Sequence, residues 1–147
     1  MLLPPVSGFR GGDSLWEERM ANRIRITAGD VSLTAELNDS ECARKIWDAL
    51  PLEANAYTWG DEIYFRIPVS AGPENPKEIV EVGDLGYWPE GSCFCIFFGP
   101  TPISRGDEIR PASAVEVFGR IEGDAKRLAN VGSGANVRVE RLSTTGN

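Results

Sequence analysis

Apolar and polar positions alternate with a period of two along much of the chain from residue 22 onward, which is typical of β-strands with one covered face. In the clearest case, residues 31–37, one face carries Val31, Leu33, Ala35 and Leu37. Residues 92–98 instead form an unbroken apolar run, which predicts a strand covered on both faces. These patterns predict strands at residues 23–27, 31–37, 54–59, 62–68, 92–98, 114–121 and 136–142.

A repeated Gly-Asp dipeptide separates the apolar runs. Glycine tolerates positive φ and aspartate bonds to the nearby backbone, so Gly-Asp between strand patterns predicts a tight turn. The dipeptide occurs at residues 29–30, 60–61, 83–84, 106–107 and 123–124.

One helix is predicted between the second and third strands. Asp39 or Ser40 caps it, Glu41 lies in its first turn, and Pro51 ends it. Its apolar positions recur at helical spacing and are Ala43, Ile46, Trp47 and Leu50. A second, short helix is predicted at residues 124–130. The fold class is therefore mainly β, a closed barrel of about eight strands with one clear and one short helix capping its ends.

The first 20 residues differ from the rest, because they contain glycine, proline and mixed charges without periodicity. We expect residues 1–20 to form a disordered N-terminal extension and residues 21–147 to form one domain.

Charge and hydropathy narrow the range of partners. The net charge is −7, from 22 acidic and 15 basic residues, and no basic stripe suited to nucleic acid is visible. No stretch approaches the ~20 apolar residues of a membrane span, so we expect no membrane partner. The sequence leaves the oligomeric state open.

The chain contains no histidine, which excludes Ser-His-Asp and Cys-His catalysis and any histidine-ligated metal. Its three cysteines are Cys42, Cys93 and Cys95. The last two alternate on one strand face and suit small buried fillers better than a metal site. We therefore expect no metal and no cofactor, and reduced thiols favour a cytoplasmic protein.

Four segments, taken in order, resemble cyclophilins. They are the strand-helix segment at residues 33–50, Tyr64-Phe65-Arg66-Ile67, Gly91-Ser92-Cys93-Phe94-Cys95-Ile96 and Val117-Phe118-Gly119-Arg120-Ile121. The chain is more closely similar to a compact bacterial and archaeal group of uncharacterised cyclophilin-like proteins. That likeness rests on Trp59-Gly60-Asp61-Glu62-Ile63-Tyr64-Phe65, on residues 83–91 and on residues 97–102. It implies the barrel but no settled activity.

The cyclophilin resemblance implies that Arg66 stands where the family has its catalytic arginine, so Arg66 is the candidate catalytic residue of a prolyl isomerase. The rest of that pocket departs from the family. The phenylalanine and glutamine that follow Pro68 in the family are absent, Cys95 replaces a phenylalanine, and Ile103 and Glu108 fall near the tryptophan and histidine positions. An ordinary exposed strand arginine remains the alternative for Arg66.

Three hypotheses follow. The first is a binding module that holds a peptide or small ligand in a side cleft of the barrel; its candidate residues are Tyr64, Arg66, Trp88, Cys95, Phe97 and Thr101. The second is a residual prolyl isomerase, and the third is a structural domain without pocket chemistry. The alternative for Trp88 and the Phe97–Phe98 pair is that they fill the core, which is the commoner role of such side chains. The acids at 61–62 and 107–108 are interpreted as turn residues rather than catalysts.

Overall fold

The computed structural model describes residues 22–142. Nine strands lie in this part of the chain: β2 (Arg23–Ala28), β3 (Val31–Leu37), β4 (Leu52–Asn55), β5 (Tyr57–Thr58), β6 (Glu62–Arg66), β7 (Asp84–Trp88), β8 (Cys93–Phe97), β9 (Glu116–Glu122) and β10 (Asn136–Arg141). Two helices accompany them, α2 (Glu41–Ala49) and the 3₁₀-helix η1 (Ala125–Asn130).

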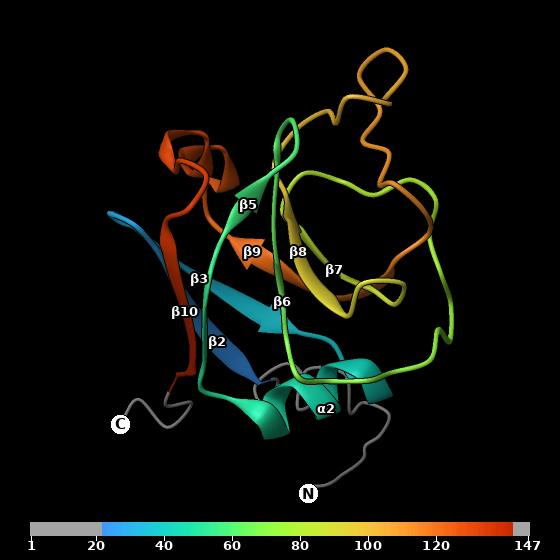
Figure 1. Cartoon of the computed structure of the whole chain (residues 1–147). Coiled ribbons are helices and arrows are strands. Elements are labelled where there is room, and N and C mark those ends of the chain that lie inside the picture. Colours follow the sequence, from blue (N-terminus) through green and yellow to red (C-terminus); the bar gives the residue numbers. More distant parts are fainter. Residues whose placement is uncertain (1–21, 143–147) are drawn as a thin grey trace, which may run out of the picture.

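All nine strands belong to one antiparallel sheet in the order β4-β10-β2-β3-β9-β7-β8-β6-β5. The two end strands, β4 and β5, are separated in the chain only by Ala56, so the sheet curls into a nearly closed barrel (Figure 1). The predicted mainly β barrel is confirmed.

The alternating strands fill the barrel as their patterns predict. In β3 every second residue from Val31 to Leu37 is buried, and β2 pairs with it through a hairpin whose Gly29 has φ +58°. Aromatic rings add contacts inside, because Phe94 stacks on Phe65 at 4.9 Å and meets Phe118 edge-on at 5.0 Å. The Tyr87 hydroxyl donates to the Val69 carbonyl at 2.6 Å, which satisfies a polar group in the core.

The two helices lie at opposite ends of the barrel (Figure 1). α2 starts after Ser40, whose hydroxyl accepts a hydrogen bond from the Ala43 amide at 3.1 Å. Asp124 caps η1 by accepting from the Lys126 amide. Both predicted helices are confirmed.

A second apolar layer lies on the outer face of β7 and β8. It consists of Val80, Cys93, Cys95, Phe97, Ile109 and Val115, with Tyr64, Trp88 and Val117 partly buried against it. The segments 67–83 and 98–115 run outside this wall, and isolated bridges join Lys77 to Val115 and Val80 to Ile109. β8 is therefore covered on both faces, as its unbroken apolar run predicts.

Three strand predictions need correction. The strand predicted over residues 54–59 is two strands, because Ala56 bonds to the loop before β10 and the chain then changes partner from β10 to β6. β8 begins at Cys93 because Ser92 has φ +54° within the preceding turn. β7 was not predicted at all.

The prediction for residues 1–20 lies outside the described residues. Within residues 22–142, neither helix has the length and apolar character to cross a membrane.

Candidate ligand-binding site

β6 sends alternate side chains to the two sides of the barrel wall. Ile63 and Phe65 are buried in the barrel core. The other face carries Glu62 and Tyr64, which pair in register with Phe97 and Cys95 of β8. Because directly paired residues of antiparallel strands share a face, these side chains lie together on the outside of the barrel.

A cavity of about 280 Å³ opens at this place. Aromatic and apolar groups dominate its lining, which consists of Trp59, Glu62, Tyr64, Trp88, Cys95, Pro111, Ala112 and Val115. The three aromatic residues come from the β5–β6 turn, from β6 and from the end of β7, and the segment before β9 supplies the last three residues. Segments far apart in sequence thus build one largely apolar site with a single carboxyl group.

That carboxyl group, Glu62, is only 6% exposed. Burial raises its pKa from 4.5 to about 7, and hydrogen bonding with the Cys95 thiol offsets part of the rise. The Cys95 thiol also lies 3.9 Å from the Cys93 carbonyl oxygen. Because a thiol has one proton, it serves one acceptor at a time, and the described residues give the Glu62 carboxyl no other side-chain partner.

Two neighbouring groups, the Ser113 hydroxyl and the turn at Gly91, contact the Trp88 side chain that lines the cavity. Its indole Nε1 donates to the Ser113 hydroxyl at 2.6 Å, which ties β7 to the segment that forms the rim of the cavity. A Cβ at position 91 would lie 2.7 Å from the indole ring, so Gly91 lets the turn after β7 pass close to it. On the other side, Tyr64 stacks on Tyr57 with ring centroids 5.6 Å apart. Trp88 and Tyr64 therefore each contact a neighbouring side chain outside the cavity.

Comparison with known proteins agrees with this architecture. A profile described as cyclophilin-like matches residues 22–140, which is most of the chain. The chain belongs to the cyclophilin-like family. The solution structure of a hypothetical protein from Archaeoglobus fulgidus is similar to it, with 44% identity and a TM-score of 0.72 over 83% of this chain and 95% of that one. A search of curated proteins gave no match.

The cyclophilin-like barrel brings three of the six predicted site residues together, because Tyr64, Trp88 and Cys95 all line the cavity. Arg66 is exposed on the same face of β6, where it pairs in register with Cys93, but it does not line the cavity.

Phe97 and Thr101 lie elsewhere. Phe97 is fully buried in the layer beneath the cavity, so the core-filling alternative holds for it, and Phe98 likewise packs inside the barrel. Thr101 is buried in its own loop, where its hydroxyl contacts Ser104 and donates to the Arg110 carbonyl. Neither residue lines the cavity. Phe97 is buried in the outer layer, and the Thr101 side chain bonds within its own loop to Ser104 and to the Arg110 carbonyl.

Sequence reasoning missed five residues of the cavity lining, namely Trp59, Glu62, Pro111, Ala112 and Val115. Glu62 was interpreted as a turn acid because it follows Gly60-Asp61. The signal that could have found it is the two-residue period of β6, which places it on the same face as Tyr64.

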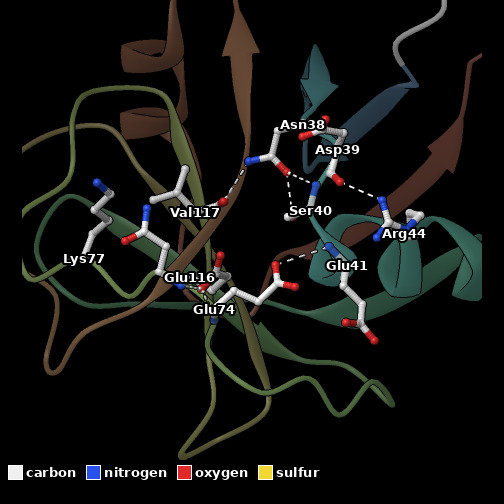
Figure 2. Close-up of a pocket in the computed structure, with 10 residues that line it drawn as sticks. Asn38, Asp39, Ser40, Glu41, Arg44, Glu74, Lys77, Glu116 and Val117 are labelled. Atoms are coloured by element: carbon white, nitrogen blue, oxygen red, sulfur yellow. Dashed lines mark hydrogen bonds between the residues drawn. The ribbon is translucent and has the colours of Figure 1, made fainter.

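A second and larger concavity, about 520 Å³, lies beside the start of α2. Figure 2 shows that its polar groups bond mainly to one another. The buried Glu116 carboxylate accepts from the Glu74 and Asn75 amides at 2.8 Å each, and Glu74 accepts from the Glu41 amide. Asn38 donates to the Val117 carbonyl at 2.9 Å. With these groups already paired, we regard the groove as structural.

Proposed function

We propose that this protein is a binding module whose ligand, a small molecule or one side chain of an extended peptide, occupies the cavity beside Glu62. The observation that carries the proposal is an apolar cavity on the outer face of the barrel that holds one buried carboxyl group among three aromatic side chains. Ligand sites in proteins combine an apolar lining with a few polar groups in this way.

The size of the cavity limits the occupant. Its volume of about 280 Å³ is near the lower end of the range for small-molecule sites. A compact molecule, or a single side chain, would fill it. Arg66 lies two residues beyond Tyr64 on the same face of β6 and is exposed, so it could contact the part of a longer ligand that extends out of the cavity.

The proposal is tested by a fragment screen on protein with labelled tryptophan indoles. Bound fragments should shift the indole N–H resonances of Trp59 and Trp88, which line the cavity, and leave that of Trp47 unchanged. Trp47 is a matched internal control because it lies on α2, with the Arg141 guanidinium 4.6 Å from its ring.

Replacement of Tyr64 by alanine, which removes one wall, should weaken the binding of every fragment found. Binding that shifts only Trp47, or a complete screen with no shift at Trp59 and Trp88, would contradict the proposal.

A further inference from the structure

The lining of the cavity is unbalanced in charge. Among its eight residues Glu62 is the one that can carry a full charge near neutral pH, and none is basic. A carboxylate removed from water is costly unless a cation or several donors accompany it. Within residues 22–142 its side-chain partner is a single thiol, that of Cys95. The lining therefore provides no cation for the Glu62 carboxylate, and a positively charged ligand would supply one.

The aromatic side chains of the cavity also favour a positively charged ligand. The faces of aromatic rings carry negative potential and attract cations, with tryptophan the strongest. Two tryptophans and one tyrosine line this small space, while Pro111, Ala112 and Val115 offer apolar contact for a hydrocarbon stem. The net charge of −7 further raises the local concentration of cations around the protein.

We propose that the ligand of this cavity carries an organic ammonium group, which forms an ion pair with the Glu62 carboxylate among the aromatic side chains. The inference rests on the proposed function, since it assigns a chemical class to the occupant of the same cavity. A free amine and a lysine-type side chain of a peptide share this chemistry, and the experiment below separates them.

Binding should depend on pH in a defined direction. Burial raises the pKa of Glu62 to about 7, and only the ionised carboxylate pairs with an ammonium ion. The affinity should therefore fall about 30-fold between pH 8 and pH 5.5, as the carboxylate becomes protonated.

The groups around Glu62 should not obscure this change. The pKa values of Tyr64, Cys93 and Cys95 are all raised, with burial as the main cause, so these groups stay neutral over the range. Arg66 lies farther along the same face, is exposed and does not line the cavity. The rim residues Pro111, Ala112 and Val115 carry no titratable side chain.

The test compares 2-phenylethylammonium with the nearly isosteric neutral 2-phenylethanol at pH 8, with the shifts of the Trp59 and Trp88 indole resonances as the readout. We expect the ammonium compound to bind at least tenfold more tightly. Glu62→Gln should abolish this preference. Glu53→Gln, which makes the same charge change at an exposed residue on β4, should preserve it.

A blocked lysine tripeptide and its acetyl-lysine form make the second arm. Binding of the lysine form alone would indicate a peptide source for the ammonium group, whereas binding of the free amine alone would indicate a small molecule.

Measurable binding of the amine and the alcohol with equal affinity, or a preference that survives in Glu62→Gln, would overturn the ammonium inference and leave the binding function standing. Failure of all four probes would also overturn it. The binding function itself falls only if the broader fragment screen fails as well.

Discussion

The buried Glu62 carboxyl lowers the unfolding free energy of the free protein as pH rises, because its pKa is higher in the folded chain than in the unfolded chain. Below pH 4.5 the carboxyl is protonated in both the folded and the unfolded chain. Between pH 4.5 and about 7 the unfolded chain loses the proton while the folded one keeps it, so the folded state loses stability as pH rises. Relative to Glu62→Gln, we expect the wild type to lose roughly 2–3 kcal/mol of unfolding free energy between pH 5 and pH 8.

Urea unfolding of both proteins at the two pH values measures this difference. Glu53→Gln is the control and should follow the wild type, since Glu53 is more than half exposed. A constant difference between wild type and Glu62→Gln across this range would contradict the buried state of the Glu62 carboxyl.

Ser113 fixes the position of Trp88 through one hydrogen bond of 2.6 Å. Ser113→Ala removes the acceptor and leaves the indole N–H without a partner, so we expect a loss of about 1 kcal/mol in unfolding free energy. The Trp88 indole resonance should shift and broaden as the ring gains freedom. Ser70→Ala, at an exposed serine, should do neither. An unchanged Trp88 resonance in Ser113→Ala would show that packing alone holds the ring.

For individual residues, the sequence predicts part of the cavity lining. The period of β6 and the position of Trp88 before Pro89 suffice to predict Tyr64 and Trp88 as neighbours of a cleft. Glu62 follows Gly60-Asp61, where an acidic residue is expected in a turn, so the sequence alone gives no reason to place it in a site. The hydrogen bonds that turn Thr101 away depend on Ser104 and on the Arg110 carbonyl, and no local pattern predicts them.

At the level of the elements, the start of α2 is fixed by a local hydrogen bond at its N-cap. The Ser40 hydroxyl accepts from the Ala43 amide, so Ser40→Ala should lower the unfolding free energy by about 1 kcal/mol. Ser32→Ala, on an exposed position of β3, should change it by less than about 0.5 kcal/mol. Equal losses in both variants, measured by urea unfolding, would argue against the cap.

Turns and strands differ in how well the sequence predicts them. All five Gly-Asp glycines have positive φ, as their chemistry requires. β7 escaped prediction because it contains Gly86, which is rare within strands, and because Asp84 was assigned to the preceding turn. The reason for Gly86 is spatial, since a Cβ there would lie 2.8 Å from the Val115 side chain. Val115 is distant in sequence, so no local pattern contains that constraint.

At the scale of the whole molecule, the barrel and the layer on its outer face have different origins. The alternating strands dictate the barrel. The outer layer depends on the pairing of segment 67–83 with segment 98–115 through the Val80–Ile109 and Lys77–Val115 bridges. Neither segment contains a regular strand, and segment 98–115 supplies three residues of the cavity lining, so the cavity could not be predicted from periodicity.

The molecule should not act as an efficient prolyl isomerase. The cavity offers the substrate a carboxyl group, whereas Arg66, which the resemblance assigns as the amide donor, lies outside the lining. In a protease-coupled assay with proline peptides, we expect the wild type and Arg66→Ala to match the uncatalysed rate, with an active cyclophilin as positive control. Acceleration by the wild type that Arg66→Ala abolishes would contradict this expectation.

NMR titration of the Glu62 carboxyl carbon is the most direct test that this group is buried in an aromatic-lined cavity whose lining contains no basic side chain. We expect a midpoint near pH 7 in the free protein and a lower midpoint in the presence of saturating 2-phenylethylammonium. A midpoint near pH 4.5 that the amine leaves unchanged would show a solvated carboxylate and contradict the burial of Glu62.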